Sequence, residues 1–149
     1  MNIENYNQAV TDELMSLLLT ADPDKNSIYK YISDSAILVA RDESNLIGVA
    51  VLKNESGQFE LVNIAVKDDY QGKGIAKHLI AEIKLLAKSM GAKELLVGTG
   101  NSSLSQLALY QKCGFRIDHV ETDYFSTYPM PIYENGIRCL DKIVLHIGL

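Results

Sequence analysis

The stretch Gln71-Gly72-Lys73-Gly74-Ile75-Ala76 lies between a predicted strand and a predicted helix, and it decides which fold the sequence favours. Glycine allows a tight turn and a close approach of the backbone to a ligand. The first N–H groups of a helix lack partners within it and, with the helix dipole, suit an anion such as a pyrophosphate. We therefore predict that residues 71–76 bind phosphate, with Lys73 and Lys77 adding charge nearby. The alternative is that the two glycines only form a tight turn.

Two other phosphate-binding loops do not fit these residues. A Walker loop requires Gly-Lys followed by Ser or Thr, whereas Gly72-Lys73 is followed by Gly74. A dinucleotide-binding fingerprint requires a third glycine three residues after Gly74, and Lys77 stands there. The loop therefore belongs to neither of these two motifs.

The pattern of apolar residues around this loop predicts an α+β fold. We expect strands at 36–40, 46–52, 59–66, 94–97, 115–123 and 138–147. We expect helices at 10–19, around 28–32, at 75–90 and at 102–113, the last one capped by Ser102 or Ser103. The first two strands should pair antiparallel across their short turn. Strand 59–66, which is apolar on both faces, helix 75–90 and strand 94–97 should form a crossover at the centre.

Length, charge and composition argue against several classes of protein. The 149 residues fit one domain, expected to span residues 1–149, and the net charge of −5 argues against a nucleic-acid surface, which is generally basic. No stretch reaches the ~18 apolar residues of a membrane span, and the opening MNIENYNQAV lacks the pattern of a secretion signal, so we expect a cytoplasmic protein. The two cysteines and three histidines are scattered without metal-ligand spacing, and we expect no metal site.

Three motifs, in the right order, are similar to those of a known family. Gln71, Gly74 and Ala76 match the pattern Gln/Arg-x-x-Gly-x-Gly/Ala, the run NIAVKDDY precedes them at 63–70, and LYQKCGF follows at 109–115. With these motifs the chain resembles the GNAT family of N-acetyltransferases from about residue 37 onward. The run ENGIRCLD at 134–141 resembles an uncharacterised bacterial subgroup of that family. The resemblance implies a mixed, mostly antiparallel central sheet with a strand–helix–strand crossover and flanking helices.

The resemblance also implies a co-substrate, acetyl-CoA, and residues that hold it. Backbone N–H groups of the loop would hold the CoA pyrophosphate: Gln71, Gly72, Lys73, Gly74, Ile75 and Ala76. The edge of the preceding strand would pair with the pantetheine arm as an added strand would, through Ile64, Ala65 and Val66. Asn101 is a further candidate for contact with the cofactor.

Acetyl transfer from a thioester to an amine needs a base for the amine and a proton donor for the leaving thiolate. Tyr110 stands where the family usually carries its catalytic tyrosine, and a phenol can donate a proton. Its alternative role is that of a core tyrosine. Glu60 is the candidate base, because a carboxylate in a strand that is apolar on both faces is costly unless it is paired or used. Its alternative is an exposed position at the entrance of the strand.

The acceptor amine is less well defined by the sequence. Asn63 is a candidate for orienting the substrate, or marks an irregularity in the strand. In the loop 124–136, Tyr124 and Glu134 could attract a cationic amine, or the loop is a solvated connection. A small-molecule amine and a protein lysine both fit as acceptors, and family analogy favours a homodimer. The alternative to an enzyme is a non-catalytic module that senses acyl-CoA.

Overall fold

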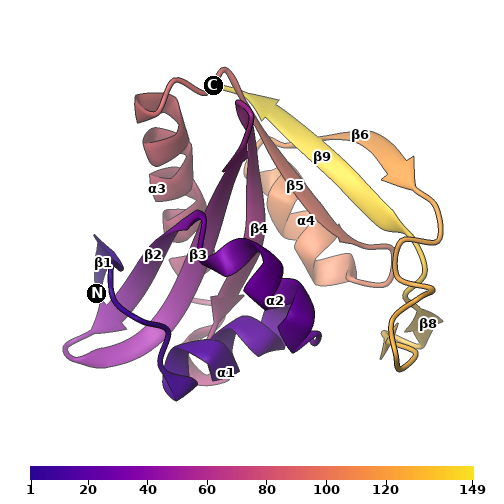
Figure 1. Ribbon diagram of the computed structural model, residues 1–149, viewed down its shortest axis with the longest axis horizontal. Coiled ribbons are helices and arrows are strands. Elements are labelled where there is room, and N and C mark those ends of the chain that lie inside the picture. Colours follow the sequence, from indigo (N-terminus) through magenta and orange to yellow (C-terminus); the bar gives the residue numbers. More distant parts are fainter.

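A mixed seven-stranded sheet forms the centre of the computed structural model, which describes residues 1–149 (Figure 1). The helices are α1 (Asp12–Ala21), α2 (Lys25–Ile32), α3 (Ile75–Ser89) and α4 (Leu104–Lys112), with a short 3-10 helix at Asp68–Tyr70. The strands are β1 (Asn2–Asn5), β2 (Ser35–Asp42), β3 (Asn45–Glu55), β4 (Gln58–Val66), β5 (Glu94–Gly100), β6 (Arg116–Glu121), β7 (Tyr133–Glu134), β8 (Ile137–Arg138) and β9 (Lys142–Gly148). The sheet order is β1-β2-β3-β4-β5-β9-β6, and β7 and β8 form a separate hairpin.

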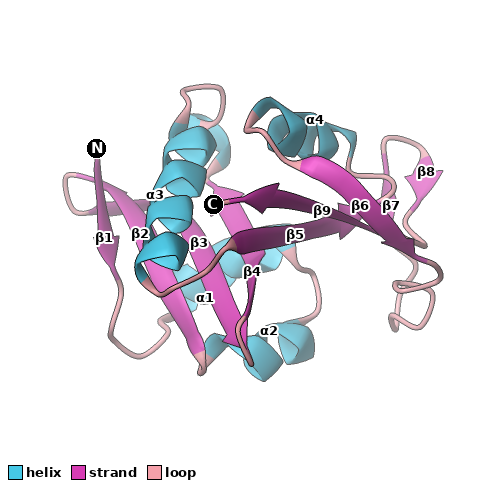
Figure 2. Ribbon diagram, turned by 90° about the horizontal axis from the view of Figure 1, so that it is seen from above, coloured by secondary structure: helices cyan, strands magenta, loops and turns pink.

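The predicted crossover at the centre is confirmed. Strands β4 and β5 are parallel and are joined through α3, whereas every other pair in the sheet is antiparallel. Helices α3 and α4 cover one face of the sheet, and α1 and α2 cover the other (Figure 2). Two apolar cores result, one under α3 that includes Leu79 and Ile83, and one under α1 and α2 that includes Leu18 and Ile28.

Strands β4 and β5 diverge after a short paired segment (Figure 1). Only residues 59–61 of β4 pair with β5, at 95–97, whereas the pairing of β4 with β3 continues to Val66. A register shift accompanies the divergence, because Leu61 pairs with Leu52 and Asn63 with Val51, which leaves Val62 between them without a partner. The last residues of β4 therefore have a free edge on the side of β5.

The helix ends follow the sequence closely at some points and not at others. Helix α1 begins two residues later than predicted, because Thr11 is its N-cap and accepts a hydrogen bond from the N–H of Leu14 (3.2 Å). Gly91 (φ 92°) and Gly114 (φ 97°) end α3 and α4 in the left-handed conformation, as glycine after a helix commonly does. The predicted capping of α4 by a serine side chain is wrong, since Ser103 is the N-cap but makes no side-chain capping bond.

The C-terminal strands also differ from the expectation. The predicted strand 138–147 begins only at Lys142, because Arg138 pairs with Tyr133 in the β7–β8 hairpin and Cys139 donates its N–H to the carbonyl of Ile132 (2.8 Å). Strand β6 ends at Glu121, two residues early. Strand β1 and the β7–β8 hairpin were not predicted.

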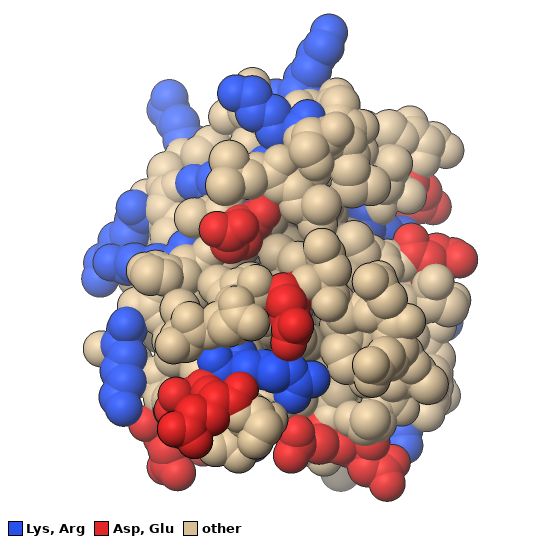
Figure 3. All heavy atoms as spheres, turned by 90° about the vertical axis from the view of Figure 1, so that its left-hand side faces the viewer, with Lys and Arg blue, Asp and Glu red and all other residues tan.

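No helix combines the length and the apolar composition that a membrane crossing would need. On the face seen in Figure 3, basic and acidic side chains are interspersed, in keeping with a chain that has 14 Lys and Arg against 19 Asp and Glu.

Candidate functional site

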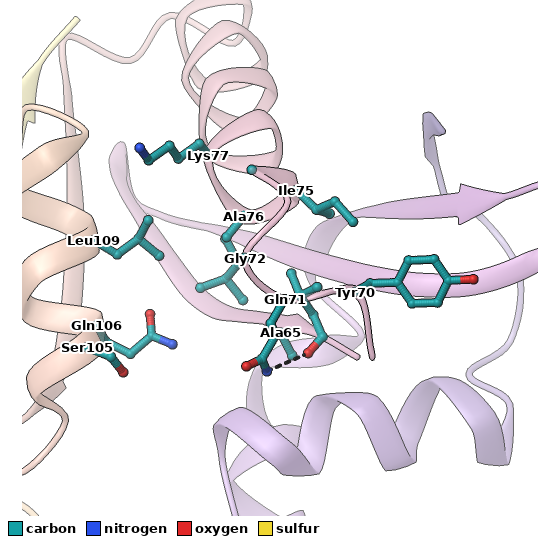
Figure 4. Close-up of a pocket in the computed structure, with 13 residues that line it drawn as sticks. Ala65, Tyr70, Gln71, Gly72, Ile75, Ala76, Lys77, Ser105, Gln106 and Leu109 are labelled. Carbon is teal, nitrogen blue, oxygen red and sulfur yellow. Dashed lines mark hydrogen bonds between the residues drawn. The ribbon is translucent and has the colours of Figure 1, made fainter. Parts of the chain in front are cut away.

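A pocket of about 430 Å³ opens where β4 separates from β5, between the loop before α3 and helix α4 (Figure 4). It brings together the strand edge and the loop that the sequence predicted as neighbours of one ligand. Its lining residues are Ile64, Ala65, Val66, Tyr70, Gln71, Gly72, Gly74, Ile75, Ala76, Lys77, Ser105, Gln106 and Leu109. Of the two predicted lysines, Lys77 lines the pocket and Lys73 does not.

The loop before α3 has the conformation of an anion-binding turn. Gly72 (φ 78°) and Gly74 (φ 81°) both lie in the left-handed region, and Gly74 is the N-cap of α3. A Cβ at either position would meet no atom within 4 Å, so glycine is required by the backbone angle rather than by space. The first hydrogen bond of α3 runs from the N–H of His78 to the carbonyl of Gly74. The N–H groups before His78 therefore have no partner within the helix, and no acidic side chain in the first turn competes for them.

Side chains of the loop anchor it to the sheet. The Gln71 amide donates to the carbonyl of Val66 (3.1 Å) and to the Asp68 carboxylate (3.3 Å), which ties the loop to the end of β4. The Tyr70 hydroxyl donates to Asp42 at the end of β2 (3.2 Å), and the ammonium of Lys73 lies 5.2 Å from the centre of the Tyr70 ring. These contacts hold the start of α3 in a fixed position beside the free edge of β4.

The pocket fits CoA, the ligand implied by the sequence resemblance, in two respects. The N–H groups in the first turn of the 15-residue helix α3 have no partner within the helix, and such groups suit a pyrophosphate. The edge of β4 at 64–66 is not paired with β5, so its backbone groups are open to an extended, amide-containing arm. Both features line the same cavity.

Tyr110 on α4 follows the pocket-lining residue Leu109, but its own side chain is buried in the core between α4 and the sheet. Its side chain is 4% exposed and packs edge-on against Phe115, with ring centres 6.0 Å apart. The same two residues close the end of α4, because the N–H of Phe115 donates to the carbonyl of Tyr110 (3.0 Å). Burial raises the pKa of Tyr110, and Cys113 raises it further, so the phenol is neutral at physiological pH. A neutral phenol keeps its proton available as a donor.

Glu60 lies on the opposite face of β4 from Phe59 and Leu61, which face the core under α3. Its carboxylate is paired with the ammonium of Lys142 on β9 (3.3 Å). Lys142 crosses β5 directly above Gly98, where a Cβ would come within 2.2 Å of its Cε atom. The Lys142 ammonium also lies 4.8 Å from the centre of the Tyr124 ring, so this tyrosine joins the same group. No role could be predicted for Lys142, because its partner Glu60 lies 82 positions away in the sequence and no local pattern links the two.

Asn63 occupies the register shift of β4 and is buried, with 4% of its surface exposed. Its amide nitrogen donates to the carbonyl of Leu18 and to the hydroxyl of Tyr31, both at 3.0 Å. The side chain therefore ties β4 to α1 and α2. Its position at the register shift agrees with the second alternative, a residue that marks an irregularity in the strand. Its carbonyl oxygen is buried without a hydrogen-bond partner.

Asn101 and Glu134 lie away from the pocket and have partners inside the chain. The carbonyl oxygen of Asn101 accepts from the N–H groups of Leu140 (2.8 Å) and Asp141 (3.0 Å). The Glu134 carboxylate accepts from the hydroxyls of Ser102 (3.1 Å) and Ser103 (2.8 Å). Both side chains thus hold the segment after β6 against the start of α4.

Three comparisons with known proteins all match this chain to acetyltransferases. The profile of the acetyltransferase (GNAT) domain matches residues 33–117. A Bacillus subtilis (strain 168) protein named as the uncharacterized N-acetyltransferase YvbK is 44% identical over 144 residues, which make up 95% of this chain and 93% of that protein. An IAA acetyltransferase from Bacillus cereus superposes with a TM-score of 0.93 at 46% identity over 99% of both chains. A GNAT family acetyltransferase from Elizabethkingia anophelis with acetyl-CoA bound has a TM-score of 0.93 at 41% identity, over 99% of this chain and 97% of that one.

Proposed function

The chain belongs to the GNAT acetyltransferase family, and from this premise we propose that it transfers an acetyl group from acetyl-CoA directly to a primary amine, without a covalent enzyme intermediate. The observation that carries the proposal is the pocket that is lined both by the loop before α3 and by the free edge of β4. The similar Elizabethkingia anophelis protein binds acetyl-CoA, which supports the same co-substrate here. One N-acetyltransferase domain accounts for residues 1–149.

Each part of the co-substrate has residues to hold it. The backbone N–H groups of residues 72–76 bind the pyrophosphate, helped by the dipole of α3, whereas the N–H of Gln71 already donates to the carbonyl of Asp68 (3.2 Å). The backbone at 64–66 bonds the pantetheine arm and helps to polarise the acetyl carbonyl. Acetyl-CoA supplies the acetyl group as an activated thioester.

Two side chains move protons in the proposed reaction. A free alkylamine, with a pKa of about 10.4, is mostly charged at neutral pH and must lose a proton before it attacks. Glu60 takes this proton through a water molecule, and the Lys142 ammonium, 3.3 Å away, holds its carboxylate in place. As the new C–N bond forms and the C–S bond breaks, the Tyr110 hydroxyl gives a proton to the departing thiolate. The attacking nitrogen loses its second proton as the amide forms, and this proton restores the Tyr110 hydroxyl, while Glu60 releases the first proton to solvent.

The acceptor approaches from the face of the sheet that carries Glu60, where Asn63 and Tyr124 are the candidate contacts. Small-molecule amines and protein lysines both fit this chemistry. Family analogy supports a homodimer, and we propose a cytoplasmic location. Asn101 and Glu134 act in the proposal by holding the segment after β6 in position, given their hydrogen bonds within the chain.

Calorimetric titration with acetyl-CoA, followed by a thiol-release assay over a panel of amines, tests the proposal. We expect acetyl-CoA to bind and at least one amine to release thiol. Lack of acetyl-CoA binding would contradict the assignment of the pocket. Tight binding without turnover on amines and peptides would instead favour the sensor of acyl-CoA.

A further inference from the structure

Helix α4 begins with a sequence pattern that its structure does not use. Ser103-Leu104-Ser105-Gln106 matches the capping box, in which the serine hydroxyl and the glutamine side chain each bond the other residue's N–H. Here the N–H of Ser103 donates to the carbonyl of Gly100 (3.0 Å) instead. The Ser103 hydroxyl donates to Glu134 (2.8 Å). Helix capping therefore does not account for Gln106.

The Gln106 amide is left facing the pocket without a partner. Its carbonyl oxygen is buried and makes no hydrogen bond. Figure 4 shows the side chain extending from α4 into the pocket, toward the wall formed by Ala65 and Gln71. A buried amide oxygen that lacks a hydrogen bond is costly, and such groups in native proteins usually have a ligand or a water as partner.

We propose that Gln106 is a cofactor-binding residue that hydrogen-bonds an amide group of the pantetheine arm from the side opposite β4. This inference rests on the proposed function. The free edge of β4 at 64–66 can bond one side of an extended amide-containing chain. A glutamine amide offers one acceptor and two donors, which matches the amide groups on the other side of that chain. Gln106 and β4 thus hold the arm between them.

Calorimetry with two ligands separates this role from others. One ligand is CoA, and the other is its nucleotide half, an adenosine bisphosphate that lacks the pantetheine arm. Gln106→Met keeps the length of the side chain but removes its hydrogen bonds. We expect the Kd for CoA to rise about five- to tenfold, which corresponds to one lost hydrogen bond. The Kd for the nucleotide half should stay the same.

Gln111→Met is the matched control on the same helix. Gln111 is exposed, and its amide donates to the carbonyl of Leu107 (3.0 Å) rather than toward the pocket. This variant should bind both ligands as the wild type does. Unchanged CoA binding by Gln106→Met would overturn the inference, and so would an equal loss for both ligands, which would indicate a distorted pocket. Failure of the wild type to bind CoA would instead overturn the proposed function, and this inference with it.

Discussion

Lys142 on β9 reaches across β5 and places its ammonium 3.3 Å from the carboxylate of Glu60 on β4. Burial is the largest single effect on the pKa of Lys142 and would lower it, but Glu60, Tyr124 and Glu121 together outweigh burial, and the pKa lies above its ordinary value. The stabilisation from a raised lysine pKa is complete below the ordinary value near 10.5 and is lost only as the pH rises through the raised value. The Lys142 ammonium therefore stays charged beside Glu60 throughout the neutral range.

This pair makes a prediction about catalysis. Glu60→Gln should lower kcat by about 100-fold, with little change in the Kd for acetyl-CoA. Lys142→Met removes the cation that holds the Glu60 carboxylate in place, so kcat should also fall, but by less than in Glu60→Gln. Lys88→Met, a loss of charge at an exposed position on α3, should leave kcat unchanged in the thiol-release assay. Wild-type kcat in Glu60→Gln would argue against Glu60 as the base.

Tyr110→Phe should separate catalysis from folding. The packing of the ring on Phe115 is kept, so the free energy of unfolding should change by less than about 1 kcal/mol. Loss of the proton donor should lower kcat by about 100-fold or more, with little change in the Kd for acetyl-CoA. Stopped-flow or steady-state thiol release, together with denaturant unfolding, measures both quantities. Tyr29→Phe, at an exposed tyrosine of α2, should change neither. Wild-type kcat in Tyr110→Phe would leave the tyrosine with a core role alone.

The two glycines before α3 allow a test with an internal control. Gly74→Ala places a Cβ on a residue with φ 81°, and Gly57→Ala does the same at φ 87° in the turn between β3 and β4. Neither Cβ would meet another atom within 4 Å, so both variants should lose about 1–2 kcal/mol of stability from backbone strain. Only Gly74→Ala should weaken CoA binding, because it disturbs the N–H groups that face the pocket. Equal CoA affinities in the two variants would show that the loop is only a tight turn.

The central crossover could be predicted because it depends on local patterns. Each of its signals is contained in a short segment of sequence. These signals are the apolar stripe of α3, the preceding strand that is apolar on both faces, and the glycines at 91 and 114. Strand β1 could not be predicted in this way, since Asn2–Asn5 has one half-buried residue and is defined by its pairing with β2. The hairpin of β7 and β8 is likewise short and exposed on both strands.

In the candidate site, too, features within one stretch of sequence could be predicted, whereas contacts between distant residues could not. The predicted phosphate loop and the edge of β4 are close in sequence, and both line the same pocket. The pairing of Lys142 with Glu60 joins residues 82 positions apart, and no local pattern signals it. The serines before α4 show the converse, because a good capping pattern is overridden by a carboxylate, Glu134, that arrives from a distant loop.

Asn63 gives a final test of how far a predicted substrate contact serves the fold instead. Its amide bonds the Tyr31 hydroxyl and the carbonyl of Leu18, so Asn63→Leu should lower the free energy of unfolding by about 2–3 kcal/mol, as both partners lose a buried hydrogen bond. In a Tyr31→Phe background one of these partners is already gone, so the added cost of Asn63→Leu should be smaller by about 1 kcal/mol. Denaturant unfolding of the four proteins in this cycle measures the coupling. The buried carbonyl oxygen of Asn63 lacks a hydrogen-bond partner. If Asn63 also orients the amine, Asn63→Leu should raise the KM for the amine and leave the Kd for acetyl-CoA unchanged. Additive stabilities in the cycle would contradict the structural link between β4 and α2.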